Sequence, residues 1–143
     1  MQGHQLEIRS KPWVLIQQNN AQSLMEDMDI VLDALDTLPG RFLLADSARQ
    51  QGIPFLHAAV AGWWGQVSTF LPHSTRDLES IYGELRSRDP AEESTGVLGP
   101  TAAVIGSLEA LEAIRLLIGR TPAYSDRLLY FDGESGMMEI LPL

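Results

Sequence analysis

The sequence predicts an α/β protein with a mixed, mainly parallel sheet and a C-terminal β-hairpin. In the first half, two short apolar runs, DIVLDAL (29–35) and PFLHAAV (54–60), flank a segment with helical spacing. Near the end, two further apolar runs flank a glycine-rich turn. Buried strands separated by a helix favour parallel pairing through a right-handed crossover. Apolar runs around a short turn favour a hairpin.

The chain is expected to begin with a strand over 13–18 (WVLIQQ) and a short helix over 23–28. Ser23 and Glu26 have the spacing of a capping box, which marks the start of that helix. The run 29–35 is brief, β-branched and bounded by polar residues, so it predicts a buried strand.

A second helix and two more strands follow. Pro39 suits the first turn of the helix and Gly52 suits its end. Its apolar stripe consists of Phe42, Leu43, Ala45 and Ala48. Residues 54–60 are expected to form a second buried strand, and 64–71 (WGQVSTFL) a third.

The second half is expected to hold an exposed excursion over 72–95, with one or two helical turns, and then the strongest helix, 96–119. That helix has apolar residues at helical spacing, whereas Glu109 and Glu112 are expected to mark its solvent-facing side. The apolar residues are Val104, Leu108, Leu111, Ile114 and Ile118. The last element is a hairpin around the turn Gly133 to Gly136.

Composition limits the classes of function. With 143 residues the chain suits one domain over 1–143, in which 1–11 is either a tail or the remnant of an upstream element. The net charge of −9, with a single lysine and nine dispersed arginines, argues against a nucleic-acid partner. No apolar run is long enough to span a membrane, and a cytoplasmic location is expected. The absence of cysteine excludes disulfides and thiolate zinc sites.

One carboxylate stands where open α/β sheets bind ligands. Asp36 follows the first buried strand and precedes the helix that begins near Pro39. It either caps this helix or binds a hard cation such as Mg²⁺. Arg41 can pair with Asp36, reach a phosphate or form a plain surface ion pair. Asp33 lies on the opposite face of an extended strand, so a structural role is expected for it.

Other motifs are few. His57 interrupts an apolar run, which favours a hydrogen-bonded histidine of the core or of a pocket edge. The sequence has neither GxGxxG nor GxxxxGK[ST], so it encodes no phosphate-binding loop. No Ser-His-Asp set stands in a recognisable frame. The residues alone therefore lead to an α/β domain with a candidate cation site at Asp36.

Three stretches together resemble the ThiF/MoeB/HesA family, the prokaryotic relatives of ubiquitin-activating enzymes. DIVLDALDTLPGR resembles the family's strand that ends in D-x-x-D-N before an arginine. GIPFLHAAVAGWWGQVSTFLP resembles its G-I-P…G-x-x-G-Q-V strand pair. GVLGPTAAVIGSLEALEAIRLLIG, the most specific of the three, resembles its G-V-L-G-P helix, and the terminal hairpin fits as well. The resemblance covers about residues 12–143 and implies the C-terminal half of a Rossmann-like ThiF/MoeB fold.

The resemblance also implies a reaction. Enzymes of this family use ATP and Mg²⁺ to adenylate the C-terminal glycine of a ubiquitin-like sulfur-carrier protein. By resemblance, Asp36 handles the magnesium and phosphates, and Arg41 steadies that aspartate or the nucleotide. Asp33 matches the family's more structural carboxylate. A homodimer is implied too.

The sequence departs from the family in several respects. The family's nucleotide loop and its ATP-contacting basic residues have no counterpart in this sequence, so this segment alone is expected neither to bind ATP tightly nor to be active. Thr37 replaces the usual asparagine. The family's zinc-binding cysteine pairs and its cysteine before G-V-L-G-P are absent, which excludes zinc and a thioester on this chain. The alternative is a non-catalytic module that dimerises or binds a ubiquitin-like protein.

Overall fold

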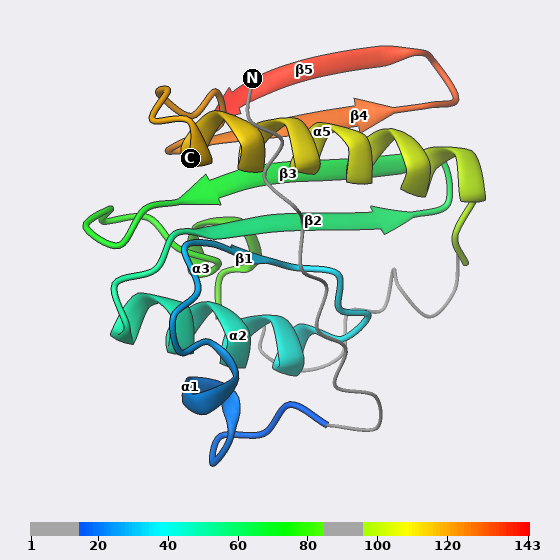
Figure 1. Ribbon diagram of the computed structural model, residues 1–143. Helices are drawn as coiled ribbons and strands as arrows, with labels where there is room; N and C mark the ends of the chain where they lie inside the picture. Colours follow the sequence, from blue (N-terminus) through cyan, green and yellow to red (C-terminus); the bar gives the residue numbers. More distant parts are fainter. Residues whose placement is uncertain (1–14, 85–95) are drawn as a thin grey trace, which may run out of the picture.

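A computed structural model describes residues 15–84 and 96–143. Five strands form one sheet in the order β1-β2-β3-β4-β5 (Figure 1). The strands are β1 (Val31–Leu32), β2 (Phe55–Ala61), β3 (Trp64–Phe70), β4 (Arg127–Asp132) and β5 (Met137–Pro142). The helices are α1 (Ala21–Leu24), α2 (Leu38–Gln50), α3 (Glu79–Tyr82) and α5 (Gly99–Leu117). The predicted mixed α/β fold with a C-terminal hairpin is confirmed.

The prediction of a mainly parallel sheet was wrong in its balance. β1 and β2 pair in parallel across the α2 crossover, as expected, but the other three pairs are antiparallel. Only Gly62 and Trp63 separate β2 from β3, since Ala61 pairs with Trp64. Parallel neighbours need a crossover of a dozen or more residues, so this turn forces a hairpin. Gly62 adopts a positive φ of 54°, as the first position of many two-residue turns requires.

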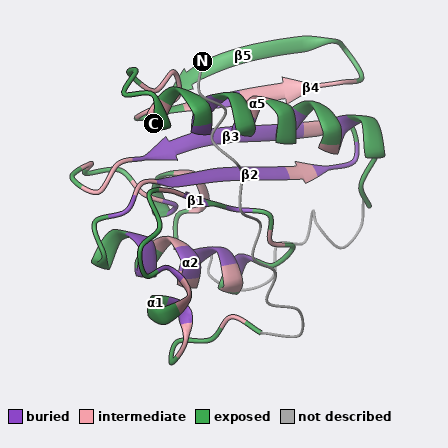
Figure 2. Ribbon diagram, in the orientation of Figure 1, coloured by how far each residue is buried: buried purple, intermediate pink, exposed green. Residues whose placement is uncertain are grey.

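Two apolar clusters fill the two faces of the sheet. One lies beside α2 and includes Phe42, Phe55, Phe70 and Leu78. The other lies beneath α5 and consists of Ala58, Val67, Ile105 and Leu129. Because strand side chains alternate between faces, β2 and β3 contribute to both clusters and are buried almost throughout (Figure 2).

Helix α5 lies very close to β3. A Cβ on Gly65 would overlap the side chain of Ile105, so glycine at this position permits the approach. α5 begins at Gly99 and ends at Leu117, close to the predicted 96–119, and α2 likewise matches its predicted range. None of the described helices combines the length and apolar character that crossing a bilayer requires.

Two local predictions were wrong at the start of the chain. Residues 15–18 of the expected strand 13–18 are not in a strand. α1 begins at Ala21 with Asn20 before it, so Ser23 lies inside the helix and its hydroxyl donates to the Asn20 carbonyl instead of capping. Residues 1–11 and 85–95, the expected tail and part of the expected excursion, lie outside the described residues.

Candidate functional site

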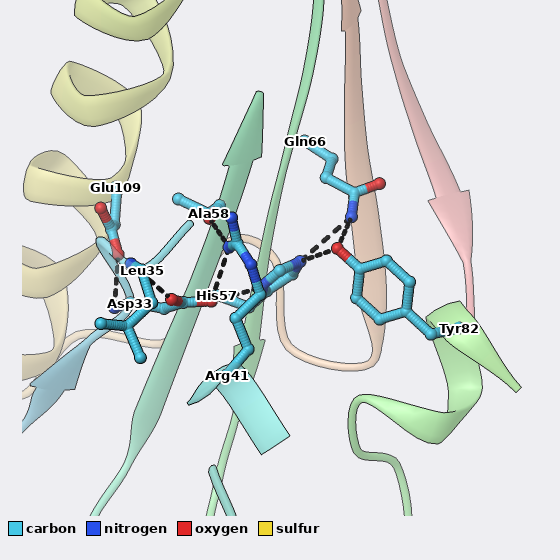
Figure 3. Close-up of polar contacts among 8 residues, drawn as sticks. All are labelled: Asp33, Leu35, Arg41, His57, Ala58, Gln66, Tyr82 and Glu109. Carbon is cyan, nitrogen blue, oxygen red and sulfur yellow. Dashed lines mark hydrogen bonds and ion pairs between the residues drawn. The ribbon is translucent and has the colours of Figure 1, made fainter. Parts of the chain in front are cut away.

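Asp33 is a buried carboxylate at the carboxyl end of β1, with 1% of its surface exposed. Its Oδ2 accepts hydrogen bonds from Arg41 at 2.9 Å and from Nδ1 of His57 at 2.8 Å (Figure 3). Its Oδ1 accepts one from the Leu35 N–H at 3.1 Å. A buried charge is tolerated when it is paired and hydrogen-bonded, so Asp33 has the structural role expected of it.

Arg41 lies in the first turn of α2, where it is 4% exposed. Its guanidinium contacts Asp33 and the carbonyl oxygen of Ala58. The expectation that Arg41 would pair with Asp36, or sit in a plain surface ion pair, is therefore wrong. The reason is that Asp33 points inward beneath α2, where a cation stabilises it, whereas Asp36 points to solvent.

His57, on β2, is fully buried and hydrogen-bonded, as expected for a core histidine. Burial lowers its pKa, although the hydrogen bond and the charge of Asp33 oppose that shift. A neutral ring that donates from Nδ1 to Asp33 accepts at Nε2, where the Tyr82 hydroxyl (3.1 Å) and the Gln66 amide (3.0 Å) converge. The Gln66 amide also donates to the Tyr82 hydroxyl at 2.9 Å. We call Asp33, Arg41, His57, Gln66 and Tyr82 the Asp33 cluster.

Glu109 reaches the same strand end from α5. Its Oε1 accepts a hydrogen bond from the backbone N–H of Asp33 at 3.1 Å. Burial, and then the negative charge of Asp33, raise the pKa of Glu109 to about 7. Glu109 was predicted on the solvent-facing side of the helix and is instead 7% exposed. That prediction was wrong because the backbone N–H of Asp33, directly after β1, faces Glu109 from the sheet.

Glu112 is a second inward-facing carboxylate of α5, also predicted on the wrong side. It is 1% exposed, and its Oε1 accepts from the Thr69 hydroxyl (3.1 Å) and the Tyr124 N–H (2.8 Å). The opposite side of α5 is exposed in Figure 2. We define the outer face of α5 by its exposed apolar residues Val104, Leu111, Ile114 and Leu117, together with Ile118 directly after its last turn.

Asp36 lies in a different environment from Asp33. It is exposed, in the bend between β1 and the start of α2 at Leu38. No hydrogen bond or ion pair joins its carboxylate to any of the described residues, and α2 has no side-chain cap from Thr37. The described residues contain no group of three or more metal-ligating side chains. Asp36 could therefore supply one carboxylate to a hard cation whose other ligands come from phosphate and water.

A groove of about 200 Å³ opens beside this strand end. It lies between the end of β1, β2 and α5, and both Asp33 and Glu109 line it. Its remaining walls include the small residues Ala34, Ala59 and Gly106. The arrangement brings an exposed carboxylate, a groove and a buried ion pair to one end of the sheet.

Three comparisons connect this arrangement to known proteins. The profile of the ThiF family matches residues 4–143. The chain is 31% identical over 129 residues to the SAMP-activating enzyme E1 of Haloferax volcanii, covering 89% of this chain and 47% of that protein. It is 33% identical over 123 residues to the adenylyltransferase and sulfurtransferase MOCS3 of Xenopus laevis, covering 82% of this chain and 26% of that protein. The chain thus spans half the length of these curated relatives or less.

Solved structures share the fold at low identity. PaaA superposes with a TM-score of 0.65 at 10% identity, covering 88% of this chain and 46% of that one. Escherichia coli MccB with ATP superposes with a TM-score of 0.63 at 12% identity, covering 90% and 41%. The family match spans nearly the whole sequence and agrees with both the relatives and the fold. This chain belongs to the ThiF family.

Proposed function

We propose that this chain is the C-terminal part of an enzyme that adenylates the C-terminal glycine of a ubiquitin-like sulfur-carrier protein, with ATP and Mg²⁺. Membership of the ThiF family supports the reaction type. The names of the two relatives support the substrate class, since one activates SAMP and the other combines adenylyl and sulfur transfer. A cytoplasmic setting belongs to the same proposal.

The observation that carries this proposal is the exposed carboxylate of Asp36. It follows a strand in parallel pairing and precedes the N-terminus of α2, where the helix dipole and free N–H groups favour phosphate. Bound at Asp36, Mg²⁺ would neutralise charge on the nucleotide phosphates. The carboxylate would hold the cation, and Arg41 would steady the segment that carries Asp36 through its ion pair with Asp33, or contact the nucleotide from the groove that it lines.

The chain alone is expected to lack activity. Its sequence has no glycine-rich phosphate loop, whose backbone N–H groups would supply most anion contacts. Calorimetry should therefore detect no micromolar binding of ATP·Mg to the chain. A longer protein that joins this segment to a phosphate loop should catalyse ATP–pyrophosphate exchange only with its carrier. The matched control is the same carrier without its terminal glycine. Exchange that ignores that glycine would contradict the proposal.

Homodimerisation is part of the proposal. The outer face of α5 presents five apolar side chains that are 37% to 61% exposed, and exposed apolar patches of this kind mark interaction surfaces. Light scattering coupled to size exclusion should give twice the 15.8 kDa chain mass at high micromolar concentration. Ile114→Glu should return the mass to one chain, whereas Glu139→Lys on β5 is the control. A clean monomer across the concentration range would contradict the dimer.

The outer face of α5 also favours a second candidate function. A non-catalytic module would use these apolar residues to bind a ubiquitin-like protein, and it would need no nucleotide. The two candidates separate in the exchange assay on the longer protein. Glycine-dependent exchange supports the enzyme, whereas carrier binding without any exchange supports the module.

A further inference from the structure

One ion pair joins the two residues that flank the segment carrying Asp36. Asp33 directly follows β1 and precedes the segment 34–40, and Arg41 comes after this segment in the first turn of α2. Their side chains meet at 2.9 Å, and both are at most 5% exposed. The Leu35 N–H, donating to Asp33 Oδ1, fixes the first turn of the segment. The position of Asp36 therefore depends on where the Asp33 carboxylate is held.

The His57 ring also holds the Asp33 carboxylate in place. His57 Nδ1 donates to Asp33 Oδ2, the oxygen that Arg41 also contacts. The far side of the ring is fixed by Gln66 and Tyr82, and the Tyr82 ring packs edge-on against it at 5.6 Å between centroids. Figure 3 shows this line of contacts from Tyr82 through His57 to Asp33 and Arg41.

We propose that His57, oriented by Tyr82 and Gln66, is a positioning residue for Asp36. It acts through the Asp33–Arg41 ion pair and has no hydrogen bond to Asp36 itself. With Nε2 held, the ring presents its one N–H to Asp33 in a fixed direction. A ring that loses this hold can rotate, the Asp33 carboxylate can follow it, and the segment 34–40 then loosens.

The chemistry of the core supports positioning over simple stability. A buried ion pair with a polar chain behind it stabilises a fold no better than well-packed apolar residues of similar volume. Its advantage is directional, because each hydrogen bond fixes an orientation. Here the hydrogen bonds of Arg41, His57 and the Leu35 N–H all end on the Asp33 carboxylate. Asp33 lies three residues before Asp36, the carboxylate that the proposed reaction uses.

The first test uses the chain itself and does not depend on the proposed function. Hydrogen exchange by NMR reports the Leu35 and Arg41 amides, which bond within the segment and its ends. The reference amides are those of β4 and β5, which contain no residue of the Asp33 cluster. Tyr82→Phe removes only the hydroxyl, and exchange at Leu35 and Arg41 should rise about fivefold with the reference unchanged. Tyr130→Phe, which alters a hydroxyl on β4 outside the Asp33 cluster, should change neither set.

Two substitutions of His57 separate positioning from packing. His57→Gln keeps an N–H donor for Asp33, whereas His57→Leu fills space without one. The hydrogen-exchange rate of the Leu35 and Arg41 amides should be lowest in the wild type, higher in His57→Gln and highest in His57→Leu. Equal exchange in the two variants, or a rise that the reference amides share, would overturn the proposal and leave His57 a packing residue.

The second test rests on the proposed function. In a longer protein active in ATP–pyrophosphate exchange, Tyr82→Phe should lower kcat about fivefold and leave the KM for ATP unchanged. A change in KM alone would overturn the positioning role. If the unaltered longer protein shows no exchange, the proposed function fails, but the hydrogen-exchange result still decides the proposal about His57.

Discussion

Asp33 and Asp36 are two carboxylates three residues apart in opposite surroundings. Asp33 is 1% exposed and accepts hydrogen bonds from Arg41, His57 and the Leu35 N–H. Asp36 is exposed and makes no contact of this kind with the described residues. Both follow the same short strand, so the difference comes from which side of the chain each occupies.

This contrast separates two uses of a negative charge. A carboxylate whose oxygens are already occupied cannot take a ligand without losing its partners, and that loss would leave buried charges unpaired. A solvated carboxylate has no such partners to lose. The inward-facing Glu109 and Glu112 of α5 resemble Asp33 in that each is buried and accepts a hydrogen bond from the sheet side through its Oε1.

The largest expected effect tests the buried member of the pair. Asp33→Ala leaves the Arg41 guanidinium buried without its counter-charge, which should lower the free energy of unfolding by about 3–5 kcal/mol. Urea unfolding of the chain, followed by circular dichroism, measures the loss. Asp36→Ala is the matched control and should leave the midpoint unchanged. Similar losses of unfolding free energy in Asp33→Ala and Asp36→Ala would contradict the distinction between a buried structural carboxylate and a solvated one.

A smaller effect is expected at Glu112. Glu112→Ala leaves two donors without their acceptor, the buried Thr69 hydroxyl and the half-buried Tyr124 N–H, so about 2–3 kcal/mol of stability should be lost. Glu134→Ala, in the exposed hairpin turn, is the control in the same urea titration. A loss no larger than that of the control would mean that Glu112 faces solvent, as its helical spacing alone had indicated.

The smallest effect depends on pH and has the opposite sign. The folded-state pKa of Glu109, about 7, lies above its ordinary value of 4.5, so its contribution to stability is full below pH 4.5 and is lost as pH rises through 7. Glu109→Gln keeps an acceptor for the Asp33 N–H without the charge. It should stabilise the chain by about 1–2 kcal/mol at pH 8 and by nothing at pH 4. A difference that does not vary with pH would contradict this.

Element positions were largely predictable from the sequence, but the orientation of α5 was not. Glycines, Pro39 and apolar spacing located α2, α5 and the terminal hairpin within a few residues. Spacing shows that Glu109 and Glu112 share a side of α5, but it does not show which side the sheet covers. Their partners lie up to 76 residues away in sequence, so no local pattern reveals them.

The partner of Arg41 was hidden for a similar reason. Asp36 is nearer in sequence, but the chain turns after β1 so that Asp33 faces inward and Asp36 outward. The polar chain through His57 could be anticipated only in part, since an isolated histidine in an apolar run suggests a hydrogen bond without naming its partners. Gln66 and Tyr82 come from β3 and α3, and only the hairpin and the packing of α3 bring them to His57.

The proposed role of Asp36 is tested most directly by one pair of measurements on Asp36→Asn. In a longer protein that contains this segment and is active, ATP–pyrophosphate exchange should fall by about 10²-fold or more, because the charge that holds the cation is lost. In the chain, the urea midpoint of the same variant should equal that of the wild type. If the ATP–pyrophosphate exchange rate of Asp36→Asn fell by no more than about threefold, the loss would be far smaller than the loss of a metal ligand causes, and it would contradict the account.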